Sequence, residues 1–264
     1  DNDRVEKSNL QRQIVHETSA IGNLKIDSAK KRIKRLNPNI QLFTFSTRIT
    51  AENVLEIIKE FDIICDCSDN FGTRYLINDA CLILNKPLVF GSVQGFEGQV
   101  SVFNLEKNSP NLRDLLPESP SKNTIPSCAE YGVVGVSTGL IGILQVNEII
   151  KIILKKGETL NGQILIFDLL NINMKKLHLK SDPVHKRIKN LSEFADFYDD
   201  DDDCTEKNSK IERINAIEFN SLYKSKPHKI LLIDVRENKE FSNSAIEGSV
   251  SIPLSHLNQD SDLE

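Results

Sequence analysis

The chain has 264 residues, of which 39% are hydrophobic and 27% are charged, and its formal net charge is −5. This composition is typical of a globular protein, and a net negative charge gives no basic field that would attract nucleic acid or an anionic membrane. No run of apolar residues approaches the ~20 that a membrane span needs, so we expect neither nucleic acid nor a membrane as a partner.

The cysteines form an odd set with irregular spacing, which is not a disulfide framework and favours a reducing compartment. The sequence contains no C-x-x-C pair, so a four-cysteine zinc site of the usual spacing is not expected. It has no Trp and one Met, whereas Lys, Ile and Asn are frequent, which is typical of AT-rich genomes such as those of plastids. We therefore expect the protein in a cytoplasm or in the plastid stroma. The cysteines are Cys65, Cys67, Cys81, Cys128 and Cys204.

The first part of the chain alternates between helix and strand patterns. Ile26, Ala29, Ile33 and Leu36 recur at helical spacing, which predicts a helix that ends before Pro38. The alternation predicts an α/β fold with a Rossmann-like, mostly parallel sheet and helices on both faces. The predicted elements are a helix over 22–36, a strand over 40–47, a helix over 53–61, a strand over 62–67, a helix over 73–85, a strand over 87–91 and a hairpin-like pair over 95–103.

The middle of the chain begins with a polar, proline-rich stretch over 104–127, which predicts a mobile loop. A structureless loop of more than ~12–15 residues in a compact domain is usually functional or disordered. A largely apolar helix follows over 140–154, and we expect it to be buried. Strands are predicted over 162–170 and 174–179.

The composition then changes to a polar segment over 183–210 that contains five consecutive aspartates, Asp199 to Asp203. Like charges at that density repel one another and stay solvated, so we expect a linker. A helix over 211–223 and a strand over 230–234 follow it. The predicted organisation is a domain over 1–182, an acidic linker over 183–210 and part of another domain over 211–264.

Three short motifs connect the chain to a known family: S-N-L-Q-R-Q from Ser8, C-S-D-N from Cys67 and S-C-A-E-Y-G-V-V-G-V from Ser127. Together they resemble the MoeB/ThiF family, which shares its fold with ubiquitin-activating enzymes, and the resemblance covers roughly residues 1–180. The tail I-D-V-R-E-x-x-E-F, followed by S-I-P-L, resembles the first half of a rhodanese domain, whose sulfur-carrying cysteine would lie beyond Glu264.

The resemblance implies ATP- and Mg²⁺-dependent adenylation of the C-terminal Gly-Gly of a ubiquitin-like sulfur carrier. The expected carrier is of the molybdopterin-synthase small-subunit type, in molybdenum cofactor biosynthesis. A carrier of the thiazole or tRNA-thiolation pathways is the alternative. The resemblance also implies a homodimer.

Adenylation builds negative charge on phosphates, so the site needs fixed cations and a metal. The resemblance assigns the cations to Arg12 and Lys25. It assigns the carboxylate that binds Mg²⁺ to Asp69, because Mg²⁺ is usually held by one or two carboxylates together with phosphate oxygens and waters. It assigns the ribose hydroxyls to Asp1 and a covalent intermediate to Cys128. It also places Ser8, Asn9, Leu10, Gln11 and Asn70 at the nucleotide.

Five of these residues have an alternative interpretation. Asp69 or Asn70 would cap the following helix equally well, and Asp1 would suit a turn. Lys25 alone would be a surface residue. Cys128 stands before a glycine-rich helix start that would lower its pKa, but a small buried cysteine fits the pattern too.

Two other functions are compatible with parts of the pattern. A nicotinamide oxidoreductase would use Asp1 on the ribose but would not need Arg12. A non-catalytic scaffold would bind the carrier without adenylating it. Many family members also hold zinc with two C-x-x-C pairs, but here the corresponding places, 111–114 and 182–185, contain no thiolate, and no zinc is expected.

Overall fold

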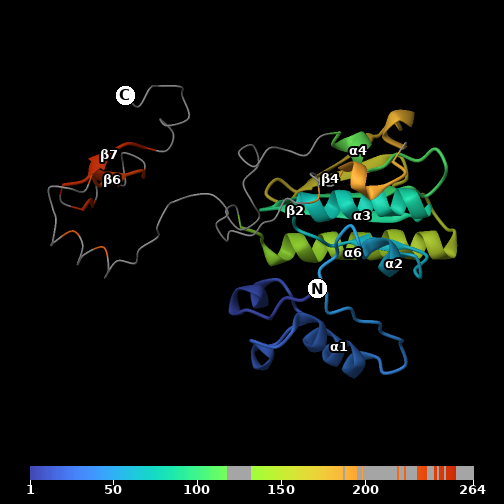
Figure 1. Cartoon of the computed structure of the whole chain (residues 1–264), viewed down its shortest axis with the longest axis horizontal. Helices are drawn as coiled ribbons and strands as arrows, with labels where there is room; N and C mark the ends of the chain where they lie inside the picture. The colour runs from blue at the N-terminus through green and yellow to red at the C-terminus, as the bar shows by residue number, and fades with distance from the viewer. Residues whose placement is uncertain are drawn as a thin grey trace. The chain divides into compact units, whose positions relative to one another are not determined.

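The structure is a computed structural model that divides into two compact units, Asp1–Cys204 and Thr205–Glu264 (Figure 1). The domain boundaries at 182 and 210 stay predictions. The structure describes residues 1–117, 132–186, 188–194, 198, 219, 223, 231–236, 241–242, 244–246 and 248–253.

The first unit contains the helices and strands predicted over its first hundred residues, with two exceptions. One is the strand over 40–47, described below, and the other is the hairpin-like pair over 95–103, where the structure has a single strand. Its strands are β1 (Ile64–Asp66), β2 (Leu88–Gln94), β3 (Glu97–Phe103), β4 (Gln163–Asp168) and β5 (Asn173–His178). Its helices are α1 (Lys25–Leu36), α2 (Val54–Ile58), α3 (Phe71–Leu84), α4 (Leu112–Leu115) and α6 (Gly135–Leu154). Short 3-10 turns are η1 (Lys7–Gln11), η2 (Thr18–Ala20), η3 (Pro183–Lys186) and η4 (Leu191–Phe194).

The five strands form one sheet in the order β1-β2-β3-β4-β5. β1 and β2 run parallel, with Cys65 opposite Val89, whereas the other three pairs are antiparallel. The α/β class is confirmed, but the expected mostly parallel sheet is corrected to a mixed one in the described residues. The reason is local: Gly95 and Phe96 alone join β2 to β3, and so short a connection permits only antiparallel pairing.

Helices cover both faces of this sheet, as predicted (Figure 1). Leu88 and Phe90 of β2 belong to a core cluster that includes Tyr75 of α3. Val89, between them, belongs to a second cluster with Ile141 of α6. Successive side chains of a strand point to opposite faces, so β2 is buried from both sides.

The strand predicted over 40–47 is wrong. The segment forms no β ladder with any described residue, and Phe43 and Phe45 are largely exposed. Its carbonyls at Phe45 and Thr47 instead accept hydrogen bonds from the Asp1 ammonium, at 3.1 and 3.0 Å. A segment with apolar residues on both faces becomes a strand only where a neighbouring strand supplies ladder hydrogen bonds.

α6 begins five residues earlier than predicted, and the expectation that it is largely buried is wrong. Its fully buried positions are Ser137, Ile141, Gln145 and Glu148. The partly buried Leu140, Leu144, Ile149 and Ile152 pack beside Ile141 against the core. Of the described helices, α6 alone is long and apolar enough to cross a bilayer, a test that core helices of water-soluble proteins also pass. Its outward apolar side chains are Val136, Ile143, Val146, Ile150, Ile153 and Leu154.

The described part of the predicted mobile loop, 104–117, is anchored by a buried ion pair. Arg113 of α4 donates from Nη2 to Oδ2 of Asp79 on α3 at 2.6 Å, and their side chains are 5% and 0% exposed. The Tyr198 hydroxyl donates to the same carboxylate at 2.7 Å. Desolvation makes unpaired buried charges unfavourable, so this pairing holds the segment against α3. The rest of the predicted loop, 118–127, lies outside the described residues.

The two places where family members carry C-x-x-C pairs lie together, joined by Asp114. Its Oδ1 accepts the Asp182 amide at 2.7 Å and lies 2.9 Å from Nδ1 of His185. Its Oδ2 accepts the amide of Asn111 at 2.8 Å. Hydrogen bonds therefore connect the two segments at these positions.

The second unit contains a parallel pair of strands, β6 (Ile233–Asp234) and β7 (Val250–Ser251). Asp234 accepts the backbone amide of Arg236 at 3.0 Å and pairs with its guanidinium at 2.6 Å. This hydrogen bonding lowers the pKa of Asp234. Of the helix predicted over 211–223, only residues 219 and 223 are described, and the rhodanese resemblance stays a prediction.

Candidate active site

A cavity of about 620 Å³ lies where β1 and β2 end, beside the start of α6. Ligands of open α/β sheets bind beyond the carboxyl ends of their strands, and small-molecule sites usually measure about 300–1,000 Å³. Three parts of the chain meet here: the segment around η1, the β1–α3 turn and the first turns of α6. Among the lining residues are Ser8, Gln11, Arg12, Gln13, Cys67, Ser68, Asp69, Arg74, Gly91, Thr138 and Gln145.

The β1–α3 turn shows which of its two polar side chains, Asp69 or Asn70, caps the following helix. Oδ1 of Asn70 accepts the Thr73 amide at 2.8 Å and caps α3. Asp69 is exposed and lines the cavity. The cap interpretation therefore applies to Asn70, and the carboxylate of Asp69 is available to a ligand in the cavity.

Two charged side chains behind this turn were not among the predicted site residues. Asp66 is 1% exposed. Its Oδ1 accepts the Ser68 amide at 2.8 Å and the Ser68 hydroxyl at 2.6 Å, and its Oδ2 has no hydrogen-bond partner in the described part of the chain. Arg74 donates to the Ser68 carbonyl at 2.8 Å and stacks over Phe90. Burial raises the pKa of Asp66, and the charge of Arg74 opposes that shift.

Gln145 of α6 also holds the turn. The sequence did not indicate this role, because the surrounding helix is largely apolar. Its Nε2 donates to the backbone carbonyl of Asp66 at 2.7 Å. A Cβ at Gly91 would lie 2.5 Å from the Gln145 side chain. Glycine in β2 therefore leaves the space through which Gln145 reaches β1.

The segment that contains S-N-L-Q-R-Q reaches the cavity as one folded unit. Asn9 is buried, and its Oδ1 accepts the Glu6 amide at 3.0 Å, so Asn9 folds the segment. Leu10 is half-buried. Gln11 donates to the carbonyl of Val133 at 3.1 Å, and Arg12 lines the cavity beside it.

The structure does not bring every predicted site residue to this cavity. Ser8, Gln11, Arg12 and Asp69 line it, with Asn9, Leu10 and Asn70 next to them in sequence. Asp1 lines a separate cavity of about 330 Å³ against α1. Lys25 donates to Oδ2 of Asp3 at 2.7 Å. Cys128 lies outside the described residues.

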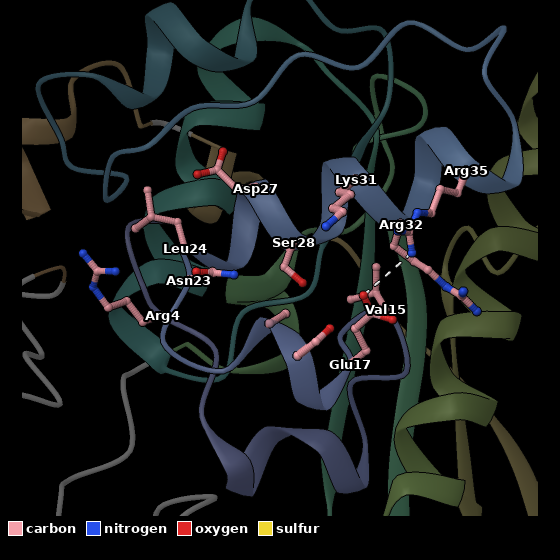
Figure 2. A pocket seen from close by; sticks show the side chains of 12 residues that line it. Arg4, Val15, Glu17, Asn23, Leu24, Asp27, Ser28, Lys31, Arg32 and Arg35 are labelled. Carbon is pink, nitrogen blue, oxygen red and sulfur yellow. Dashed lines mark ion pairs between the residues drawn. The ribbon is translucent and has the colours of Figure 1, made fainter.

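A further cleft of about 340 Å³ lies between α1 and the preceding segment (Figure 2). Arg4, Lys31, Arg32 and Arg35 line it, and Arg35 forms an ion pair of 3.8 Å with Glu17. None of the predicted site residues that the structure describes lines this cleft, so it is not the candidate active site.

A glycine at the start of α6 permits the N-terminal segment to approach the cavity. A Cβ at Gly135 would lie 2.5 Å from the backbone oxygen of Gln11. We expect Gly135→Ala to displace Gln11 and Arg12, and to destabilise the protein by about 1–3 kcal/mol as overpacking does. Thermal unfolding and ligand binding at the cavity measure the two effects.

Gly139→Ala is the matched control, because it lies in the same helix and a Cβ there meets no atom of the described residues within 4 Å. It should be neutral or stabilising, since Ala favours a helix over Gly by up to about 1 kcal/mol. Equal unfolding temperatures of the two variants would contradict the predicted clash.

Fold and site together define an α/β protein with a mixed sheet and a ligand cavity at the ends of its parallel strands. The ThiF family model matches residues 1–187. The chain therefore belongs to the ThiF family, and the family predicted from its motifs is confirmed.

Its relatives include enzymes named as adenylyltransferases. The chain is 38% identical to "Adenylyltransferase and sulfurtransferase MOCS3" of Culex quinquefasciatus, over 97% of this chain and 61% of that protein. It is 43% identical to "Sulfur carrier protein adenylyltransferase" of Thermus thermophilus, over 69% of this chain and 68% of that protein. The chain thus spans about three fifths of the length of the first relative.

Solved structures agree on the fold. Escherichia coli MccB, in a crystal structure with ATP, matches 72% of this chain and 57% of that chain, with a TM-score of 0.62 and 17% identity. At that identity the similarity concerns the fold alone.

Proposed function

We propose that the protein uses ATP to adenylate the C-terminal carboxylate of a small sulfur-carrier protein that ends in Gly-Gly. The carboxylate attacks the α-phosphate, and acyl-adenylate and pyrophosphate are formed. The observation that carries this proposal is the meeting of Arg12 with Asp69 in one cavity at the ends of β1 and β2. The names of the relatives support the same reaction.

The residues of the cavity suit the charges of this reaction. The guanidinium of Arg12 matches phosphate oxygens with its planar fork. Asp69 offers one exposed carboxylate, which fits Mg²⁺, because this ion is usually held by one or two carboxylates together with phosphates and waters. When bound, Mg²⁺ would neutralise phosphate charge. Asp66, Arg74 and Gln145 would keep Asp69 in place through the turn.

Further features of the proposal rest on the motifs. We propose Lys25 as a second cation and Asp1 as the ribose ligand, although both lie away from the cavity in this structure. Cys128 is proposed as a site of covalent attachment for the carrier. We also propose that the protein forms a homodimer and has a rhodanese-like second domain. Its proposed place is molybdenum cofactor biosynthesis, in a cytoplasm or plastid stroma.

Carrier-dependent ATP–pyrophosphate exchange by the full-length protein tests this function. We expect exchange only when a carrier with an intact Gly-Gly end is present, and none with a carrier that lacks the two glycines. Exchange with a thiazole-pathway or tRNA-thiolation carrier, but not with the molybdopterin-synthase type, would change the proposed pathway and keep the reaction.

A non-catalytic scaffold is the second candidate, favoured by the position of Lys25 against Asp3 rather than at the cavity. It predicts carrier binding without exchange. Calorimetric titration with ATP and Mg²⁺ separates the two candidates, because a scaffold would not bind the nucleotide.

A further inference from the structure

Two cysteine thiols lie side by side at the end of β1, one on Cys65 of the strand and one on Cys67, which follows its last residue. Cys65 and Cys67 are separated by one residue, and their Sγ atoms lie 3.9 Å apart. Residues two apart in a strand share a face, and both cysteines are exposed. Cys81, in contrast, is buried in the core cluster of α3.

This pair is in contact with residues of the candidate active site. Cys67 lines the cavity and immediately precedes Ser68 and Asp69. Its Sγ lies 4.0 Å from Oε1 of Gln145, whose other amide atom holds the backbone of Asp66 at 2.7 Å. A change at Cys67 therefore acts on the turn that presents Asp69.

The two thiols also differ in position. Cys67 lines the cavity, whereas Cys65 is not among its lining residues. Cys67 is thus the thiol that a hydroperoxide in the cavity meets first, and its thiolate is the nucleophilic form of cysteine. Cys65 is the neighbouring thiol that can resolve an oxidised Cys67.

We propose that Cys65 and Cys67 form a redox-active dithiol that closes to a disulfide and switches off the adjacent site. The claim about disulfide formation stands on the geometry of the pair, and the claim about switching rests on the proposed adenylation.

The oxidant is a hydroperoxide, and the chemistry balances in two steps. The Cys67 thiolate attacks the peroxide oxygen, the O–O bond breaks, an alcohol or water leaves after protonation, and a sulfenic acid remains. The Cys65 sulfur then attacks the Cys67 sulfur, the S–O bond breaks and water leaves. Two thiols and one hydroperoxide thus give one disulfide, one alcohol or water and one further water. A dithiol reductant reverses the oxidation.

Closure must distort the end of β1. The sulfurs have to move from 3.9 Å to the ~2.05 Å of a disulfide, while Cys65 is held in register opposite Val89. The strain falls on Cys67 and on the turn after it. Strained, exposed disulfides are the easily reduced, regulatory kind.

To test the proposal, the reduced full-length protein is treated with hydrogen peroxide. The masses of its cysteine peptides and its exchange activity are then measured on the same samples. Peptide mass spectrometry should find a disulfide between Cys65 and Cys67. Exchange activity should fall on the order of tenfold or more, because small displacements of a reacting group cost that much. Dithiothreitol should restore it.

Variants distinguish this pair from other thiols. Cys65→Ser should keep exchange activity in the reduced state and form no such disulfide. Cys204→Ser, the control, should behave as the unaltered protein in both measurements. Free thiols at 65 and 67 after peroxide treatment would overturn the proposal. So would a Cys65–Cys67 disulfide that leaves exchange unchanged.

Failure of the proposed function gives a different result. A reduced protein that shows no exchange with any carrier refutes the adenylation, while the mass measurement still decides whether the dithiol exists. Titration of the carrier protein into the reduced and oxidised forms then replaces exchange as the test of switching, and equal affinities would overturn it.

Discussion

Arg12→Ala is expected to lower the rate of carrier-dependent ATP–pyrophosphate exchange by a factor on the order of 10²–10³, as the loss of one charge-stabilising group does in other active sites. Arg12 contributes a guanidinium to the wall of the cavity, opposite in charge to the carboxylate of Asp69. Negative charge that develops on the phosphates would lose this fixed cation. Initial rates at saturating ATP measure the effect.

Arg32→Ala is the matched control, because Arg32 is an exposed arginine that lines a different cleft (Figure 2). It should exchange at the unaltered rate. Arg12→Lys should recover only part of the loss, since an ammonium keeps the charge but lacks the planar fork. Full activity of Arg12→Ala would contradict the assignment of Arg12 to the phosphates.

Asp79→Ala is expected to lower the free energy of unfolding by about 3–5 kcal/mol, the cost of removing one partner of a buried ion pair. Arg113 would remain 5% exposed without its carboxylate, and the Tyr198 hydroxyl would lose its acceptor. The segment around α4 would then separate from α3. Urea unfolding followed by circular dichroism measures the loss.

Two variants control this result. Glu56→Ala removes the partner of Lys59 in an exposed pair and should leave the unfolding midpoint unchanged. Asp79→Ala combined with Arg113→Met removes both buried charges and should recover much of the lost stability. An Asp79→Ala protein as stable as the unaltered one would show that the pair does not anchor the segment.

Local signals in the sequence were sufficient for most elements of the first unit. Helical spacing and the Pro38 stop predicted α1, and short apolar runs predicted β1 and β2. The same signals failed over 40–47, because a short run with apolar residues on both faces does not specify whether a partner strand is present. They also failed to give the exposure of α6, since apolar residues can face either the core or a surface that another molecule covers.

The residues of the candidate site that belong to a sequence motif could be predicted. S-N-L-Q-R-Q and C-S-D-N led to Ser8, Gln11, Arg12 and Asp69, and the structure brings these four to one cavity. Asp66, Arg74 and Gln145 were missed, because each looks like an ordinary member of its strand or helix. Their roles arise from contacts between segments up to 79 residues apart, which no local pattern encodes.

The sequence alone therefore determined the family, the α/β class and the residues of the motifs, because these depend on residue identity and short-range periodicity. Only the tertiary structure decided that the sheet is mixed, that Asp79 and Arg113 anchor the segment around α4, and that Asp1 and Lys25 lie away from the cavity. These features depend on which distant groups satisfy one another's hydrogen bonds and charges once water is excluded. The thiols of Cys65 and Cys67 combine both kinds of information: their spacing is visible in the sequence, and their exposure beside the cavity is a property of the fold.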